Sequence, residues 1–198
     1  MFAGSTWLMF RLTARVYGER AGLWAALVLN LAPVFTLSIG SWVLPDGPLM
    51  LFALVSIWFV ARPIFANSPP DELWPWLAAG AAGGLALLSK YLGVFVFAGV
   101  GLFLLTSRPH RRWLATPGPW LGALLAALVF MPVVVWNAQH GWASFAFQGR
   151  RGLRKAFNIE WLLQDIGGQI GYLLPWIAVP LIYVLARALM CERTIIMG

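Results

Sequence analysis

The longest nearly uncharged run of the chain, Leu73–Ser107, limits the possible folds most strongly. It contains 35 residues and a single charge, Lys90. One α-helix of that length would measure about 52 Å at a rise of roughly 1.5 Å per residue, whereas the hydrocarbon core of a bilayer is only ~30 Å thick. We therefore predict two short membrane helices that meet at Lys90 and Tyr91.

The composition agrees with a membrane protein. Hydrophobic residues make up 61% of the chain and charged residues 11%, compared with about 25% charged residues in soluble domains. A soluble core of this size cannot bury so much apolar surface. The basic residues lie between the apolar runs, which indicates membrane topology and contacts with lipid phosphate, and argues against nucleic acid as a partner. The single cysteine, Cys191, excludes an internal disulfide.

Further apolar runs predict an all-α, polytopic transmembrane bundle of about six spans or part-spans. Besides the two helices within Leu73–Ser107, the expected spans are Ala21–Val43, Gly47–Ala61 (a short one), Trp113–Trp136 and Ile166–Ala186. Arg62–Asp71 is expected to be a proline-rich loop and Asn137–Glu160 a polar connection. The glycine pairs Gly80/Gly84 and Gly167/Gly171 have the GxxxG spacing that permits close helix contacts.

The distribution of cations orients these spans in the membrane. One side carries nine arginines, which are Arg11, Arg15, Arg20, Arg62, Arg108, Arg111, Arg112, Arg187 and Arg193. The other side carries Lys90, Arg150, Arg151, Arg154 and Lys155. Because positive charge accumulates in cytoplasmic loops, we expect the arginine-rich side to be cytoplasmic. Asp46, Lys90 and the Asn137–Glu160 connection then share the extracytoplasmic side.

Asp46 and Lys90 are unusual charges among apolar runs. Asp46 lies between Pro45 and Pro48. It is explained either as a helix N-cap or as a carboxylate that binds a metal ion or orients a hydroxyl group at the membrane edge. Lys90 either extends its ammonium to the headgroups or binds phosphate. Tyr91 beside it is an interfacial anchor or a hydrogen-bond donor.

A second group of polar residues follows the Trp113–Trp136 span. An aromatic belt explains the tryptophans of "VVWNAQHGWASF", but it explains Asn137, Gln139 and His140 less well. His140 is a candidate metal ligand or acid/base, although a single histidine often has neither role. The following "GRRGLRK" is either a loop at anionic headgroups or a site for the phosphate of a lipid-linked ligand. No P-loop, Rossmann fingerprint, HExxH or GxSxG motif is present.

An ordered set of segments resembles glycosyltransferase family 39, the bacterial relatives of dolichyl-phosphate-mannose–protein mannosyltransferases. The segments are "RLTARVYGERAGLWAALVLNLAPVF", "PDGPLMLFALVSIWF", "GGLALLSKYLGVFVF", "VVVWNAQHGWASFAFQ" and "GGQIGYLLPW". The resemblance implies a GT-C membrane fold and an inverting glycosyltransferase of the bacterial inner membrane. Such an enzyme transfers a sugar from a polyprenyl-phosphate carrier to a lipid, glycan or protein acceptor on the extracytoplasmic face.

The resemblance also implies roles for the first three polar candidates. Asp46 matches the acidic residue of the family's "(T/S)PDxP" stretch, which makes it the catalytic candidate. Lys90 and Tyr91 match its "(T/S)KY" stretch near the carrier phosphate.

The remaining candidates match a later, "WNxxHxW"-like segment that shapes the active cavity. Asn137 and Gln139 are thereby implied to bind substrate, and His140 to bind a divalent metal ion. Arg150 and Arg151 fall where cations for the carrier phosphate are expected.

One feature of the family has no counterpart in this sequence. The family's principal catalytic aspartate lies in a loop after the first transmembrane helix, and the only acid before Asp46 is Glu19, on the predicted cytoplasmic side. We therefore expect residues 1–198 to be one membrane-embedded domain, a fragment of a larger enzyme that is inactive alone. The alternative is a non-catalytic membrane protein, such as a transporter subunit or lipid-binding scaffold. Inverted repeats would favour the transporter, and the sequence shows none.

Overall fold

The computed structural model describes residues 1–36, 44–65, 69, 72–153, 159–174, 177–184 and 186, and within these residues it contains helices and no strand. The predicted all-α class is therefore confirmed. The elements are α1 (Phe2–Tyr17), α2 (Glu19–Leu31), α3 (Pro33–Phe35), α4 (Asp46–Phe65), α5 (Trp74–Ser89), η2 (Tyr91–Gly93), α6 (Val94–Thr106), η3 (Arg111–Ala115), α7 (Pro117–Gln139), α8 (Ala143–Leu153) and α9 (Ile159–Leu173).

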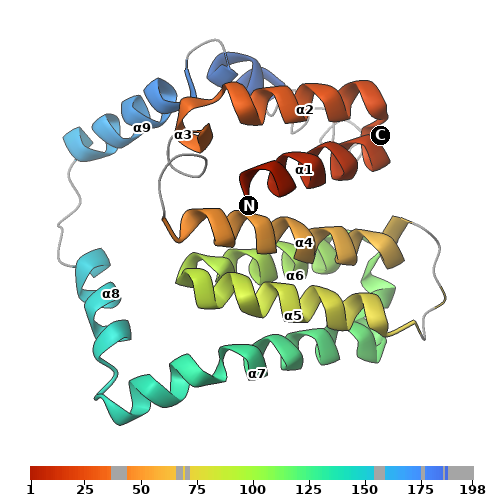
Figure 1. Cartoon of the computed structure of the whole chain (residues 1–198), viewed down its shortest axis with the longest axis vertical. Helices are drawn as coiled ribbons and strands as arrows, with labels where there is room; N and C mark the ends of the chain where they lie inside the picture. The colour runs from red at the N-terminus through yellow and green to blue at the C-terminus, as the bar shows by residue number, and fades with distance from the viewer. Residues whose placement is uncertain are drawn as a thin grey trace.

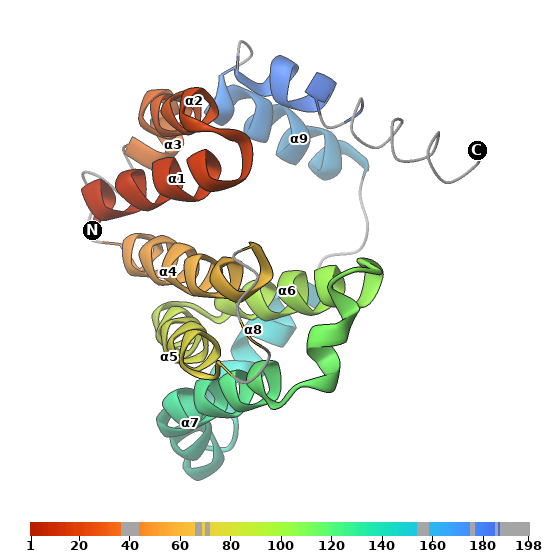
Figure 2. The ribbon, with the colours of Figure 1, turned by 90° about the vertical axis from the view of Figure 1, so that its right-hand side faces the viewer.

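Helix α5 occupies the centre of the bundle. It packs against α4 on one side and α7 on the other, and α6 contacts both α4 and α5 (Figure 1). Helices α1 and α2 form a hairpin that joins the bundle through the contact of α1 with α4. Figure 2 shows this hairpin as a layer above α4, with α5 and α7 below it. Helices α4 and α7 are long and apolar enough to cross a membrane.

The predicted break at Lys90 is present. Helix α5 ends at Ser89, Lys90 is extended (φ −161°, ψ 139°), and the chain turns through η2 into α6. Gly93 makes the turn possible, since a Cβ atom there would lie 2.7 Å from the carbonyl carbon of Ala86. The long apolar run is therefore two helices, as the thickness of a bilayer requires.

Three of the other predicted spans differ clearly from the observed helices. Ala21–Val43 is not one helix, because α2 ends at Leu31 and Ala32 is extended before Pro33. Proline disfavours the helical conformation of the residue before it. Residues 37–43 lie outside the described part of the chain.

The span predicted for Gly47–Ala61 is longer than expected. Helix α4 continues through Arg62 and Pro63 to Phe65, so it has 20 residues. Of the loop predicted for Arg62–Asp71, residues 66–68, 70 and 71 lie outside the described part of the chain. The Arg62 guanidinium lies 4.8 Å from the centre of the Trp74 ring. This cation–π contact favours the arginine at the helix end.

The C-terminal predictions also need correction. The connection Asn137–Glu160 contains a helix, α8. The last span, expected over Ile166–Ala186, is divided: α9 ends at Leu173, Leu174 has a positive φ of 66°, and a helical stretch covers residues 177–184. A left-handed residue ends an α-helix.

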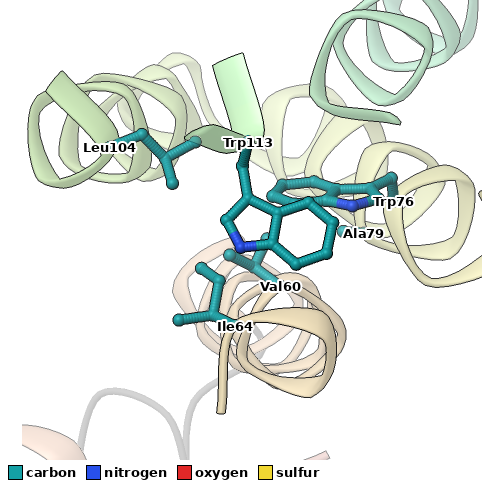
Figure 3. Packing of buried hydrophobic residues seen from close by; sticks show 6 residues of the cluster. All are labelled: Val60, Ile64, Trp76, Ala79, Leu104 and Trp113. Carbon is teal, nitrogen blue, oxygen red and sulfur yellow. The ribbon is translucent and has the colours of Figure 1, made fainter. Parts of the chain in front are cut away.

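A cluster of buried apolar side chains lies between α4, α5, α6 and η3. Trp76 and Trp113 are its largest members, with ring centres 5.7 Å apart. Neither indole nitrogen has a hydrogen-bond partner among the described residues, so this pair acts through apolar contact. The cluster is drawn in Figure 3 and comprises Val60, Ile64, Trp76, Ala79, Leu104 and Trp113.

Glycines let α5 and α7 approach very closely. A Cβ atom on Gly80 would lie 2.0 Å from the carbonyl oxygen of Gly122, and one on Gly84 would lie 2.7 Å from Cβ of Val129. The Gly80/Gly84 pair thus makes the close contact that its spacing allows. At Gly167 and Gly171, an added Cβ atom would meet nothing within 4 Å.

Gly80→Ala is expected to destabilise the fold by about 1–3 kcal/mol or more, because α5 and α7 must move apart to admit the methyl group. The measurement is thermal unfolding of the protein in a fixed detergent. Gly99→Ala on α6 is the matched control, since its Cβ atom meets nothing within 4 Å. Equal stability of the two variants would show that the α5–α7 contact is not tight.

Candidate functional site

The polar residues singled out from the sequence gather at one end of the bundle. The first turn of α4, the last turn of α5, the end of α7 and helix α8 all lie at the left of Figure 1. The end of α4, the start of α5 and the start of α7 lie at the opposite end. The predicted grouping of Asp46, Lys90 and the segment after Trp136 is therefore present in the fold.

Asp46 and Lys90 form an ion pair. Lys90 Nζ donates a hydrogen bond of 2.7 Å to Asp46 Oδ1. Asp46 belongs to the first turn of α4, and Lys90 directly follows the last residue of α5. Each charge therefore complements the dipole of its helix end. The Lys90 side chain is 38% and the Asp46 side chain 33% exposed, so both groups remain accessible to a ligand.

Tyr91 connects this pair to helix α8. Its hydroxyl group and Ser144 Oγ share a hydrogen bond of 2.6 Å. Its ring lies between Phe130 of α7, with ring centres 6.0 Å apart, and Phe145 of α8, at 5.3 Å. Tyr91 therefore holds the start of α8 against the α5–α6 turn.

Asn137 supports the same contact from inside the bundle. It is fully buried, and its Oδ1 accepts a hydrogen bond of 3.1 Å from the backbone N–H of Ser144. Its Nδ2 donates to the carbonyl oxygen of Val133 at 2.9 Å. With both ends of the amide engaged, Asn137 fixes the start of α8, and substrate binding by this residue stays a prediction.

A family comparison identifies the framework that carries these contacts. The sequence model described as dolichyl-phosphate-mannose-protein mannosyltransferase matches residues 1–136. The chain belongs to this mannosyltransferase family. Neither a curated protein nor a solved structure matches the chain.

The mannosyltransferase match includes Asp46, Lys90 and Tyr91 and ends at Trp136. It therefore bears out the resemblance for the first three of the segments compared above. The segment that begins at Asn137 follows the matched region. Together with the apolar helices α4 and α7, family membership makes this chain a membrane protein of a glycosyltransferase family.

The turn between α7 and α8 places His140 and Gln139 at the surface of this mannosyltransferase-family chain. His140 Nδ1 lies 2.8 Å from the carbonyl oxygen of Trp136 and donates to it, which leaves Nε2 as the free acceptor. The His140 ring stacks on Trp136 with centres 4.3 Å apart. Gly141 and Trp142 both have positive φ, 61° and 58°, and Trp142 N–H donates to the Asn137 carbonyl oxygen.

These surroundings do not fit a metal site made by the protein alone. Within the described ranges, no group of three or more His, Cys, Asp or Glu side chains is close enough to hold a metal ion. His140 can offer Nε2 as a single ligand. The metal role of His140 therefore stays a prediction.

For the cations after Gln139, the structure gives the position of the backbone in α8. Arg150 and Arg151 belong to α8, which begins at the Tyr91–Ser144 contact. Arg154 and Lys155 lie outside the described residues. A role for these cations in phosphate binding stays a prediction.

Two features of the site were missed in the sequence. One is the direct contact between Asp46 and Lys90, which are 44 positions apart. The other is Ser144, which contacts both Tyr91 and Asn137. A serine near the start of a helix is a common N-terminal signal, but nothing local indicates its bond to Tyr91.

Removing the Tyr91–Ser144 hydrogen bond is expected to lower stability by about 1 kcal/mol. In a double-mutant cycle of Tyr91→Phe and Ser144→Ala, the second substitution should cost little once the first is made. Thermal unfolding of the four proteins measures the coupling. Tyr183→Phe, at an exposed tyrosine, is the control, and additive losses at positions 91 and 144 would contradict the contact.

Proposed function

We propose that this chain is part of an inverting glycosyltransferase that takes a sugar from a polyprenyl-phosphate carrier. The acceptor is a hydroxyl group on the extracytoplasmic face of the membrane. Family membership supports the general class. The Asp46–Lys90 ion pair is the observation that carries the assignment of the site.

Lys90 has the chemistry needed for the carrier phosphate. It lies at the turn between two short apolar helices, where an ammonium group reaches the headgroup region while its neighbours remain in hydrocarbon. Its partial exposure leaves room for a phosphate oxygen to bind Nζ. Tyr91 anchors this turn to α7 and α8, which limits the movement of the lysine.

Asp46 supplies a carboxylate next to that cation. When phosphate binds Lys90, Asp46 loses its partner and becomes available to the acceptor hydroxyl group. A carboxylate in this position orients the hydroxyl group or accepts its proton. The same two residues thus contact the donor and the acceptor.

The proposed reaction follows from the phosphate bound at Lys90 and the acceptor hydroxyl group bound at Asp46. The acceptor oxygen forms a bond to the anomeric carbon, and the bond from that carbon to the phosphate oxygen breaks with inversion. The electron pair leaves with the phosphate, whose developing charge Lys90 stabilises. The acceptor proton passes to a carboxylate.

The test uses membranes that contain the whole enzyme of which this chain is proposed to be part, expressed from its natural gene. Dolichyl-phosphate-mannose is supplied as the donor and a threonine-rich peptide as the acceptor, and donor consumption and peptide mannosylation are measured. We expect both to depend on Asp46 and Lys90. If the double variant Asp46→Ala, Lys90→Ala keeps full activity, the proposed site is wrong.

A further inference from the structure

A largely apolar cavity of about 350 Å³ lies between α4, α5, α6, η3 and α7. It is formed by the later half of α4 and the early parts of α5 and α7, so it lies toward the end of the bundle opposite the Asp46–Lys90 pair. Figure 3 shows four of its lining residues, Val60, Trp76, Ala79 and Leu104. None of the described residues that line it is charged.

The size and lining of the cavity suit a hydrocarbon ligand. An engineered apolar cavity of about 150 Å³ stays dry and binds benzene, and this cavity is more than twice as large. An empty space of this size leaves the surrounding side chains without contacts on one side, which is unfavourable. A hydrocarbon chain would supply those contacts.

The cavity reaches the outer surface of the bundle. Leu105 and Trp120 line it, and they are 55% and 62% exposed. Two of its walls, α4 and α7, are long and apolar enough to cross a membrane. In a membrane that these helices cross, the opening would be bordered by lipid chains, which are the hydrocarbon available there.

One cation contacts the wall of the same cavity, and two more lie close to it in the sequence. Arg108, Arg111 and Arg112 are exposed and follow α6 directly. Arg111 Nε donates a hydrogen bond of 2.9 Å to the carbonyl oxygen of Leu105, a lining residue. Guanidinium groups bind phosphate well, so a lipid whose chain enters the cavity meets a cluster suited to an anionic headgroup.

We propose that this cavity binds one acyl chain of an anionic phospholipid whose headgroup contacts Arg108–Arg112. The site lies toward the end of the bundle opposite the Asp46–Lys90 pair, so it is separate from the proposed sugar-carrier site. It does not depend on the proposed reaction. A polyprenyl chain bound from the Asp46–Lys90 end is a different occupant, and the experiment distinguishes the two.

Photocrosslinking in vesicles tests the proposal. The whole chain is placed in phosphatidylcholine vesicles containing phosphatidylglycerol with a diazirine on one acyl chain, and crosslinked peptides are mapped by mass spectrometry. We expect crosslinks on the cavity-lining residues of α6 and α7. Phosphatidylglycerol should label them about tenfold more than phosphatidylcholine bearing the same diazirine, and Arg108→Gln with Arg112→Gln should remove most of this preference.

Two glycines of α6 provide a matched pair of variants. Gly101 lines the cavity and Gly99 does not, and an added Cβ atom meets nothing within 4 Å at either position. Gly101→Leu should fill the space and lower the cavity crosslinks about tenfold, while Gly99→Leu should leave them unchanged. Ala123→Leu fills the cavity from α7 and replaces Gly101→Leu if that variant does not fold.

Two results would overturn the assignment. Crosslinks spread evenly over the exposed helix faces, and insensitive to Gly101→Leu and Ala123→Leu, would show that no acyl chain occupies the cavity. Preferential labelling of the same lining residues by a diazirine-bearing polyprenyl phosphate would replace the phospholipid with the sugar carrier.

Discussion

Lys90→Gln is expected to lower the turnover of dolichyl-phosphate-mannose by about a hundredfold or more. Loss of one preorganised group that stabilises developing charge commonly costs ~10²–10³ in kcat. Here the substitution removes the ammonium group and also leaves the Asp46 carboxylate without its 2.7 Å partner. An unpaired carboxylate repels the phosphate, so we expect binding of dolichyl phosphate to weaken as well.

The measurements are donor consumption and binding of dolichyl phosphate in vesicles of phosphatidylcholine. Arg20→Gln is the control, because Arg20 is an exposed cation on α2, away from the ion pair. Lys90→Arg keeps the charge and should restore part of the binding. Wild-type turnover by Lys90→Gln would remove Lys90 from the proposed site.

The helix break at Lys90 could be predicted by comparing the length of the apolar run with the thickness of the bilayer core. The Leu73–Ser107 run is too long for one span, and Lys90 is its only charge. By contrast, the ion pair with Asp46 depends on how α4 packs against α5. The sequence indicated that both residues face the same side, but it contains no local sign of their contact.

The errors in the helix boundaries have local causes. Pro33 ends the helical path of Ala21–Val43 by restricting Ala32, a signal that hydropathy alone overrides. Helix α4 continues past Arg62, whose guanidinium contacts the ring of Trp74. Trp74 belongs to another helix, α5, so the sequence around Arg62 does not show this contact. Helix α8 lies in a segment predicted to be a polar connection, because it is not apolar enough to resemble a span.

The polar segment after Trp136 shows why the role of a single side chain is hard to predict from the sequence. The family resemblance implies that Asn137 binds substrate, and an aromatic belt explains this residue less well than it explains the tryptophans beside it. In the fold it is buried and holds Ser144 at the start of α8. The sequence does not distinguish a structural amide from a ligand-binding amide. The two differ in their hydrogen-bond partners, and here the turn at Gly141 and Trp142 brings the partner, Ser144, close to Asn137.

Asp46→Asn is expected to separate the two halves of the proposed mechanism. Loss of the carboxylate should lower turnover by about 10²–10⁴, the usual contribution of a positioned acid or base. The same change releases Lys90 from its ion pair. We therefore expect Asp46→Asn to bind dolichyl phosphate at least as tightly as the unaltered protein, whereas Lys90→Gln binds it more weakly.

The opposite directions of these two binding changes make the prediction specific. Glu72→Gln is the control for loss of an acid, because Glu72 lies before α5 and bonds to Trp74 at the other end of the bundle. It should alter neither binding nor turnover. If Asp46→Asn weakens dolichyl phosphate binding as much as Lys90→Gln does, the carboxylate holds Lys90 in place for the phosphate, and the proposed division of roles between the two residues is wrong.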